Sequence, residues 1–540
     1  MEMLIGGTWQ PAASGRAEEV TSPFDGAIIG TVPVAGADDV RAALDRAESG
    51  AAAWRRTPAF ERMRILMRAA ELADERAEQT AQIISAEAGK TIAEARGEAG
   101  RSGDLIRLAA FEGTQLYGDS LPLDANRGTG LDKIGFTIHQ PVGIVVAITP
   151  FNYPALLVMH KLAPALAAGN AVVLKPARTT PLTALALARC FTDAGLPDGV
   201  LSVLTGPGGS LGDTLVTDPR VRKVSFTGST ATGYHITQVA GIKKLSLELG
   251  SSCPVVVLPD ADIELAAAAV AAGGYVNAGQ VCISVQRVIT HPAVGADFLD
   301  ALVPKVEAIR TGNPRSEETT MGTLISAAES ERVERSIRQA VTEGAKLLTG
   351  GERDGAIVSP AVVAGVDPRS AFSQDELFGP AVAVSSADDW ESAIAQANGT
   401  PYGLGAGIFT SDVAGAVRAI REIDAGAVHI NWTPLWRADL MPYGGLKESG
   451  IGKEGPRSAV AEDTQGGGDQ PAALAVGHRV LPGQVRHDGL GDGQPHGFRG
   501  HRRSFLYQGR PCRMTVLVSV ISATAERGPS LPMPLAFRPP

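Results

Sequence analysis

Apolar residues recur with helical spacing along residues 38–53 and 59–87. In the second segment they collect on one helical face, as Ile65, Leu66, Ala69, Leu72 and Ala73. This spacing predicts two amphipathic helices near the start of the chain. The pattern then changes, because 134–140 and 142–148 are short apolar runs separated by Pro141. We expect both runs to be strands.

From residue 155 onward, helix and strand patterns alternate. One helix is predicted over 155–168 and another over 181–194, which begins with Thr180 as N-cap and ends at Gly195. Short apolar strands are predicted at 171–175 and near 200–204, 221–226, 244–249 and 254–258. A second αβ series runs from 261 to about 440, with strands at 286–290, 405–409 and 426–431. Such alternation is typical of parallel, doubly wound α/β sheets.

Length and composition narrow the class of protein. At 540 residues the chain exceeds the usual size of one domain, so we expect two or three. No apolar run approaches the roughly 20 residues that cross a bilayer, which argues against a membrane partner. Glu2 stands where a signal peptide would be basic, which favours a cytoplasmic location. Four scattered cysteines predict no disulfide framework, and no Cys/His spacing indicates a metal.

Charge is distributed unevenly along the chain. Residues 465–540 contain nine Arg, no Lys and four acidic residues, a net charge of +5, whereas the rest carries −14 of the overall −9. The acidic body argues against nucleic acid as a partner. Residues 465–540 also hold 21 Gly and Pro, and a strand or helix period persists only at 516–521. We interpret this segment as a disordered, low-complexity tail or as a frameshifted end, because its Lys-free composition is typical of out-of-frame translation of a GC-rich gene.

Candidate chemistry lies in three residues: Asn152, Glu248 and Cys282. Each has a simpler interpretation when taken alone. A single Cys in an apolar stretch is more often a buried hydrophobic residue, Glu248 could end an exposed strand, and Asn152 could form a turn before Pro154. Together, a thiol nucleophile, a carboxylate and an amide donor are the working parts of a thioacyl-forming oxidoreductase.

Five motifs occur in a fixed order around these residues. They are Phe151-Asn152-Tyr153-Pro154, Phe226-Thr227-Gly228-Ser229, Leu247-Glu248-Leu249-Gly250, Gly279-Gln280-Val281-Cys282 and Glu376-Leu377-Phe378-Gly379-Pro380. In order and spacing they resemble the aldehyde dehydrogenase superfamily over roughly residues 1–464. The resemblance implies an α/β fold with two doubly wound domains and a β-hairpin for oligomerisation, which makes a homodimer or homotetramer the expected assembly.

The resemblance also divides the chain. It implies an NAD(P)-binding domain at 1–118 and 143–249, the oligomerisation hairpin at 119–142, a catalytic domain at 250–440 and a return to the cofactor domain at 441–464. In this family the hairpin pairs with a strand near the C-terminus. That strand is not evident after residue 465, so we expect an unpaired edge on the hairpin.

The resemblance implies a mechanism of aldehyde oxidation. Cys282 would add to the aldehyde as a thiohemiacetal, and the Asn152 amide with the Cys282 backbone N–H would hold the oxyanion. Glu248 would activate the water that hydrolyses the thioester. Relatives that transfer the acyl group to coenzyme A generally lack this glutamate, so Glu248 predicts the hydrolytic type.

The expected cofactor is NAD(P)+, held on the first α/β domain. Gly228 and Ser229 would end a strand and open a helix whose N-terminal amides face the pyrophosphate, with Gly233 allowing close packing. The resemblance assigns the remaining cofactor contacts to Phe151, Lys175, Glu376 and Phe378. Many NAD-preferring members have a glutamate where this chain has Arg178, which predicts that NADP is accepted, even in preference to NAD.

The substrate is marked less clearly. Arg437 lies where subfamilies that oxidise anionic aldehydes often place an arginine, and Arg107 and His160 resemble further positions used there. Val281 argues the other way, because members with phosphorylated substrates often have arginine before the nucleophile. We expect a small anionic aldehyde. A neutral aliphatic aldehyde and a family member without turnover remain the alternatives.

Overall fold

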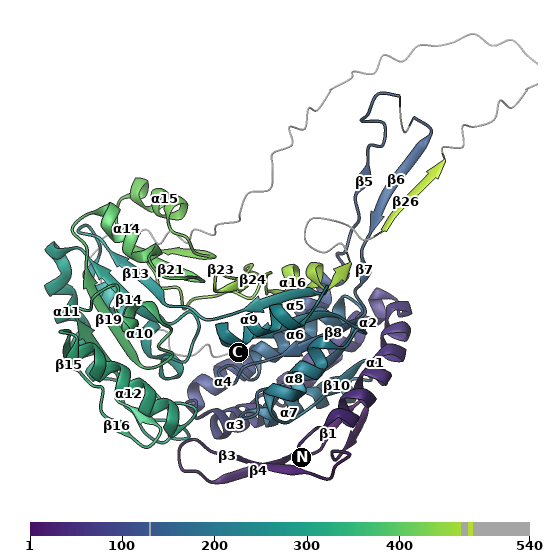
Figure 1. Cartoon of the computed structure of the whole chain (residues 1–540), viewed down its shortest axis with the longest axis horizontal. Coiled ribbons are helices and arrows are strands. Elements are labelled where there is room, and N and C mark those ends of the chain that lie inside the picture. The colour runs from purple at the N-terminus through teal and green to yellow at the C-terminus, as the bar shows by residue number, and fades with distance from the viewer. Residues whose placement is uncertain (129–130, 466–472, 479–540) are drawn as a thin grey trace, which may run out of the picture.

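Two mainly parallel sheets, each covered by helices on both faces, form the body of the protein (Figure 1). The computed structural model describes residues 1–128, 131–465 and 473–478. The first sheet has the strand order β2-β1-β10-β9-β8-β11-β12-β24. Its strands are β1 (Met3–Ile5), β2 (Thr8–Gln10), β8 (Ile144–Ile148), β9 (Ala171–Lys175), β10 (Leu201–Val203), β11 (Val221–Thr227), β12 (Lys244–Glu248) and β24 (Gly450–Ile451). The five strands from β10 to β12 are parallel.

Alternate side chains of each strand enter opposite cores. In β8, Val145 and Ala147 belong to one core and Ile144 and Val146 to the other. The first core is completed by helices α2 (Ala59–Glu75), α3 (Ala77–Ala88), α4 (Ile92–Gly100), α5 (Ser102–Glu112), α6 (Leu156–Ala167) and α7 (Pro181–Asp193). The second is completed by α1 (Ala37–Arg56), α8 (Gly208–Thr217) and α9 (Thr230–Val239). Burial on both faces explains why these strands are continuous apolar runs.

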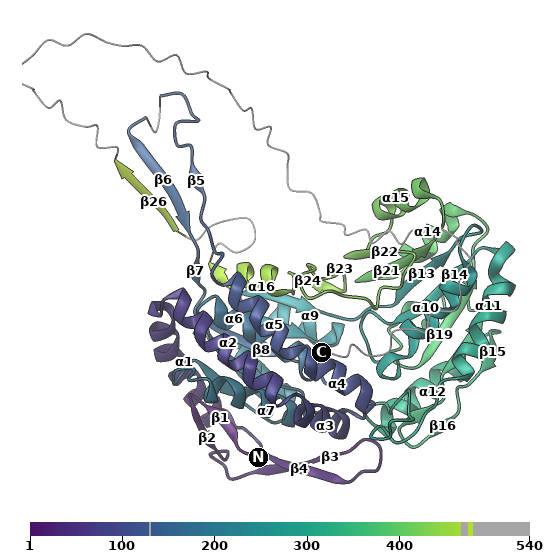
Figure 2. The same cartoon turned by 180° about the vertical axis from the view of Figure 1, so that it is seen from behind.

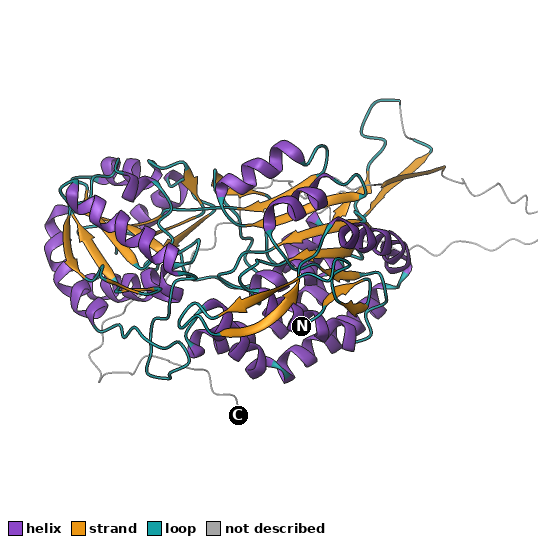
Figure 3. Cartoon of the chain, turned by 60° about the horizontal axis from the view of Figure 1, so that its bottom comes forward, coloured by secondary structure: helices purple, strands orange, loops and turns teal. Residues whose placement is uncertain are grey.

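The second sheet repeats this arrangement (Figure 3). Its order is β15-β18-β19-β14-β13-β21-β22, and only β15 runs antiparallel to its neighbour. The strands are β13 (Cys253–Val257), β14 (Val285–Thr290), β15 (Lys346–Thr349), β18 (Ala361–Ala364), β19 (Ala381–Ser386), β21 (Gly405–Phe409) and β22 (Ala427–Ile430). One face packs on α10 (Ile263–Tyr275), α11 (Pro292–Glu307) and α12 (Ala327–Thr342), and the other on α14 (Trp390–Asn398) and α15 (Val413–Glu422). The expected doubly wound α/β fold is therefore confirmed.

A β-ribbon projects from the body beside the first sheet (Figures 1 and 2). It consists of β5 (Ser120–Leu121), β6 (Lys133–Ile138) and β26 (Ala473–His478), with β6 in the middle. Strand β7 (Gln140–Pro141) pairs with β25 (Thr464–Gln465) at its base. We expected the edge of this hairpin to be unpaired, and that expectation is wrong, because all six residues of β26 pair with β6. The expected disorder or frameshift of the rest of the tail lies outside the described residues.

The remaining elements are short. They are β3 (Ala17–Thr21), β4 (Ile28–Pro33), the 3-10 helix η1 (Val276–Gly279), β16 (Arg353–Asp354), β17 (Ile357–Val358), α13 (Ala371–Gln374), β20 (Tyr402–Gly403), β23 (Leu446–Lys447) and α16 (Pro456–Glu462). Within the described ranges, no helix is both long and apolar enough to cross a membrane. The cytoplasmic location and the domain boundaries stay predictions.

Candidate active site

The carboxyl edge of the first sheet collects the predicted cofactor residues. From β8 the chain adds β9 and β10 on one side, then crosses to add β11 and β12 on the other. Ligands of open α/β sheets bind at such a switch point, outside the carboxyl ends of the strands. Here β8 leads to Asn152, β9 ends at Lys175, β11 leads to Gly228 and β12 ends at Glu248.

Asn152 and Cys282 are held in one hydrogen-bonded loop system. The Asn152 side-chain amide donates to the Gln280 carbonyl at 2.8 Å, and the Asn277 amide donates to the Asn152 carbonyl at 3.1 Å. Asn277 and Ala278 have φ of 52° and 53°, a backbone conformation that residues other than glycine rarely adopt. Strained backbone held by tight packing is typical of functional loops.

Cys282 is a partly buried thiol beside a phenol. Its sulfur lies 2.8 Å from the Tyr443 hydroxyl. Burial raises the pKa of Cys282 to about 12, against a smaller lowering by the hydrogen bond with Tyr443. At neutral pH the resting group is therefore the thiol, and a base or an oriented donor is needed to form the nucleophilic thiolate.

Glu248 is a buried carboxyl group that the described residues leave without a hydrogen-bond partner at either oxygen. Burial, followed by the charge of nearby Glu454, raises its pKa well above the usual range. A carboxylate of raised pKa is a better base, and both oxygens keep their capacity to accept hydrogen bonds. Glu248 also raises the pKa of Cys282, so the two groups lie within electrostatic reach.

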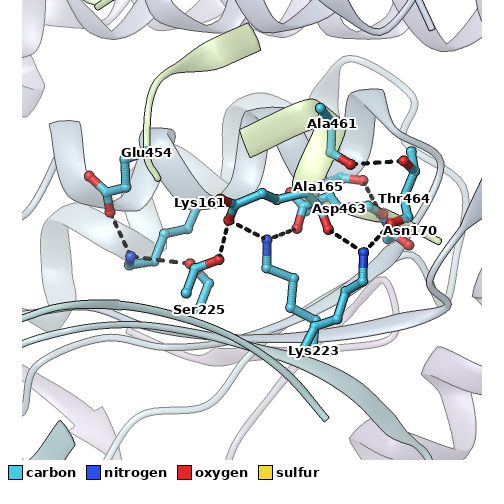
Figure 4. A network of polar contacts seen from close by, with 12 residues as sticks. Lys161, Ala165, Asn170, Lys223, Ser225, Glu454, Ala461, Asp463 and Thr464 are labelled. Atoms are coloured by element: carbon cyan, nitrogen blue, oxygen red, sulfur yellow. Dashed lines mark hydrogen bonds and ion pairs between the residues drawn. The ribbon is translucent and has the colours of Figure 1, made fainter. Parts of the chain in front are cut away.

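Glu454 is the charged counterpart of Glu248. Its Oε1 lies 2.7 Å from the Lys161 ammonium, and both side chains are almost fully buried. Although burial alone would raise it, Lys161 and further cations lower the pKa of Glu454 to about 2. Figure 4 shows Lys161 between Glu454 and Ser225, with Lys223 and Asp463 continuing the network. Glu454 is therefore a carboxylate near the candidate base, with its charge balanced by the Lys161 ammonium.

Lys175 and Arg178 are the residues predicted to face the adenosine end of the cofactor. The Lys175 ammonium is buried, donates to the Pro176 carbonyl at 2.9 Å and keeps two further N–H donors. Burial lowers its pKa to about 8. Arg178 is largely exposed and pairs with Glu18, whose Oε2 lies 2.8 Å from both Nε and Nη2 of Arg178. Sequence reasoning did not identify Glu18.

Gly228 and Ser229 lie between β11 and α9, as expected. The Ser229 hydroxyl is the N-cap of α9 and accepts from the Thr232 amide at 3.4 Å. A Cβ on Gly233 would come within 2.4 Å of the Leu249 side chain, so the glycine leaves room for α9 to pack closely on Leu249. The free amides of the first turn of α9 can therefore face an anionic group.

Phe151, Glu376 and Phe378 are the residues predicted to hold the nicotinamide end of the cofactor. The rings of Phe151 and Phe378 meet edge to face, with centroids 5.9 Å apart. The Ser251 amide donates to Glu376 Oε1 at 3.0 Å, and burial raises the pKa of Glu376 to about 7. A Cβ on Gly279 would lie 2.1 Å from the Gly379 carbonyl oxygen, so the nucleophile loop packs directly on this motif.

A cavity of about 140 Å³ opens beside Cys282. It is lined by Arg101, Asn152, Tyr153, Leu156, Leu157, His160, Val276, Val281, Cys282, Ile283, Leu435, Arg437 and Tyr443. A space of this size holds a molecule of about benzene's dimensions. The apolar wall and two arginines therefore suit a small substrate with an anionic end.

Arg437 supplies a positive charge to the wall of this cavity. Its guanidinium lies 3.9 Å from the centroid of the Tyr443 ring and 3.6 Å from Glu454 Oε2. Its buried Nε and Nη2 have no hydrogen-bond partner in the described part of the chain. Buried, unpaired guanidinium donors are costly without a ligand, because each has lost its water.

His160 and Arg107 differ in their placement. His160 lines the cavity, and burial followed by the charge of Arg437 lowers its pKa well below the usual value, so it is neutral. Arg107 does not line the cavity and pairs with Asp74 and Asp104 at the surface. Its expected substrate contact stays a prediction, whereas Arg101, which follows α4 and pairs with Asp439 at 2.5 Å, lines the cavity.

Comparisons with known proteins identify the family to which this chain is similar. The profile of the Aldehyde dehydrogenase family matches residues 9–466. The 3-sulfolactaldehyde dehydrogenase of Priestia aryabhattai is 42% identical over 464 residues, covering 86% of this chain and 96% of that protein. Escherichia coli succinate-semialdehyde dehydrogenase (NADP(+)) is 38% identical over 466 residues, covering 85% and 95%.

Solved structures extend the similarity to the fold. The NADP-dependent glyceraldehyde-3-phosphate dehydrogenase of Bacillus halodurans, complexed with NADP, matches with a TM-score of 0.85 at 32% identity, covering 88% of this chain and 99% of that one. Aldehyde dehydrogenase 21 of Physcomitrella patens, in complex with succinate, matches with a TM-score of 0.84 at 34% identity, covering 89% and 98%. The chain therefore belongs to the aldehyde dehydrogenase family and is an NAD(P)-dependent aldehyde dehydrogenase.

Proposed function

We propose that the enzyme oxidises a small anionic aldehyde to the carboxylic acid and uses Cys282 as the nucleophile. The observation that carries this proposal is Arg437, because its side chain lines the same small cavity as Cys282 and its buried Nε and Nη2 have no hydrogen-bond partner among the described residues. A carboxylate, sulfonate or phosphate on the substrate would satisfy these donors. The aldehyde carbon, a few bonds away, would then lie beside the thiol.

The first step is addition of sulfur to the aldehyde. The Cys282 thiol releases its proton to water, the resulting thiolate forms a C–S bond with the aldehyde carbon, and the carbonyl electrons move to oxygen. The Asn152 amide and the Cys282 backbone N–H donate to this oxyanion. Asn152 is already held by the loop that carries the nucleophile, through its contact with the Gln280 carbonyl, so little reorganisation is needed.

The second step removes hydride from the thiohemiacetal carbon and leaves a thioester on Cys282. Bound NAD(P)+ supplies the hydride acceptor. Lys175, the first turn of α9 and the edge-to-face pair Phe151 and Phe378 would hold it, and the buried Lys175 ammonium with spare donors fits a ribose there. Glu376 would accept hydrogen bonds from the second ribose.

The third step is hydrolysis. Glu248 takes a proton from water, the hydroxide attacks the thioester carbon, and the Cys282 sulfur leaves with its electron pair. The released acid and a reprotonated thiol complete the turnover. The raised pKa of Glu248 suits it as a base, while Lys161 keeps the neighbouring Glu454 in its ionised form.

The substrates for which similar proteins are named favour particular aldehydes. Relatives named for 3-sulfolactaldehyde and succinate semialdehyde suggest a short substrate with a terminal anion, whereas those named for lactaldehyde suggest a neutral substrate.

Formation of reduced cofactor should be measured with 3-sulfolactaldehyde, succinate semialdehyde, lactaldehyde and propanal. A kcat/KM for either anionic aldehyde at least tenfold above lactaldehyde is expected. Equal values would refute the anion site, and no turnover with any aldehyde would favour a member retained for binding.

We also infer a homodimer or homotetramer assembled through the β-ribbon. On β6, Ile134, Phe136 and Ile138 share one face and are exposed, although such side chains normally avoid water. A second copy would cover them. Light scattering of the wild type and of Phe136→Lys tests this inference: the wild type should be oligomeric and the variant smaller.

A further inference from the structure

Glu18 brings a carboxylate to the adenosine end of the cofactor cleft from a distant part of the sequence. It lies on β3, which pairs with β4, and β4 packs near α7 (Figure 1). The Thr205 hydroxyl, just after β10, donates to the Pro33 carbonyl at 2.6 Å and ties the end of β4 to the sheet. The strand pair that carries Glu18 is therefore anchored to the first sheet just after the end of β10.

The two oxygens of Glu18 have different environments. Oε2 accepts from Nε and Nη2 of Arg178 at 2.8 Å. Oε1 is buried and has no hydrogen-bond partner among the residues that the structure describes. A buried carboxylate oxygen without a donor is unfavourable, because it has lost water and gained nothing in return. A ligand that brings hydroxyl groups would remove this penalty.

The charges around this oxygen discriminate between two riboses. Lys175 lies near Glu18 and Arg178, since both alter its pKa, Glu18 upward and Arg178 downward. A ribose with free 2′- and 3′-hydroxyls brings donors to Oε1. A 2′-phosphate brings negative charge and no donor, and it would have to compete with Glu18 for Arg178.

We propose that Glu18 determines the choice between NAD+ and NADP+: its free oxygen accepts from the adenosine ribose hydroxyls, and its other oxygen withholds Arg178 from a 2′-phosphate. The carboxylate that many NAD-preferring relatives carry at position 178 is thus supplied in space by Glu18. Arg178 taken alone predicts a preference for NADP+. Because Glu18 pairs with Arg178, we expect NAD+ to bind at least as tightly as NADP+. The proposal rests on the cofactor cleft described under the proposed function.

The test is the dissociation constant of each cofactor, measured by titration calorimetry without substrate. Glu18→Gln should weaken NAD+ binding and strengthen NADP+ binding, each by about tenfold, because a hydrogen bond to a charged group is exchanged for a neutral one. Glu19→Gln is the matched control, since Glu19 is the exposed neighbour on the same strand. It should leave the ratio of the two constants unchanged.

A second variant guards against misfolding of the first. In Arg178→Gln, Glu18 keeps its charge without a partner, so NADP+ binding should fall at least tenfold while NAD+ binding persists. An unchanged NAD+ to NADP+ ratio in both variants, with the wild type binding normally, would overturn this proposal alone. Failure of the wild type to bind either cofactor would overturn it together with the assigned cleft.

Discussion

The hydroxyl of Tyr443 lies 2.8 Å from the sulfur of Cys282, and the ring of the same tyrosine packs under the guanidinium of Arg437. One side chain thus contacts both the candidate nucleophile and the candidate anion site. A substrate whose anion binds Arg437 would approach a thiol that already has a donor for its thiolate form. Binding and activation of the nucleophile are linked through this phenol.

Removing the phenol should change the pH dependence. The hydrogen bond lowers the pKa of Cys282, so Tyr443→Phe should raise it further. Because the thiolate reacts, the rate falls as pH drops below the thiol pKa, and a higher pKa moves this fall to more alkaline pH. We expect the rate of alkylation by iodoacetamide at pH 8 to drop about tenfold. If the wild type and Tyr443→Phe showed the same pH profile of alkylation, this role of Tyr443 would be contradicted.

Cys282→Ala should abolish aldehyde oxidation while cofactor binding survives, because the thiol lies outside the adenosine end of the cleft. Cys190→Ala is the matched control: this thiol is buried in the first core and should be dispensable. Steady-state assays and cofactor titration measure the two properties separately. Substantial dehydrogenase turnover without Cys282 would refute the nucleophile.

Glu248→Gln should separate the two half-reactions. Hydride transfer needs the thiol, whereas deacylation needs a base. Rapid mixing is expected to show a stoichiometric burst of reduced cofactor, followed by slow turnover. Mass spectrometry should then find the acyl group on Cys282. An unchanged steady-state rate would remove Glu248 from the hydrolytic step.

Arg437→Gln should raise KM for an anionic aldehyde by about ten- to a hundredfold, because charge-assisted hydrogen bonds are lost. The KM of a neutral aldehyde should change little. Arg107→Gln is an informative control, since Arg107 has the same charge but pairs with Asp74 and Asp104 outside the cavity. Equal effects of both variants on the anionic substrate would show that long-range charge, and not contact, is responsible.

Strand β26 should be needed for normal assembly. A chain ended after His478 keeps β26, whereas a chain ended after Gln465 leaves the edge of β6 unpaired. Unpaired strand edges promote aggregation and altered oligomers. Light scattering should therefore show a defined oligomer for the first chain and aggregates or a different size for the second. Identical behaviour of the two would mean that pairing with β26 is dispensable.

Local patterns in the sequence determined much of this protein. The alternation of apolar strands and amphipathic helices predicts doubly wound sheets, because burial on both faces demands continuous apolar strands. The turn from β11 into α9 at Gly228 and Ser229 could also be predicted from the sequence, since it depends on neighbouring residues. The order of the five motifs around Cys282 predicted the family correctly.

Tertiary structure alone decided which distant side chains meet. Arg101, between α4 and α5, lines the cavity, whereas Arg107 on α5 pairs with Asp74 and Asp104. Glu18 meets Arg178 across 160 residues of sequence. Strand β26 has a weak pattern of its own, and its pairing depends on the partner strand β6. Sequence periodicity reports burial along one element, whereas these contacts depend on how separate elements pack, which no local pattern records.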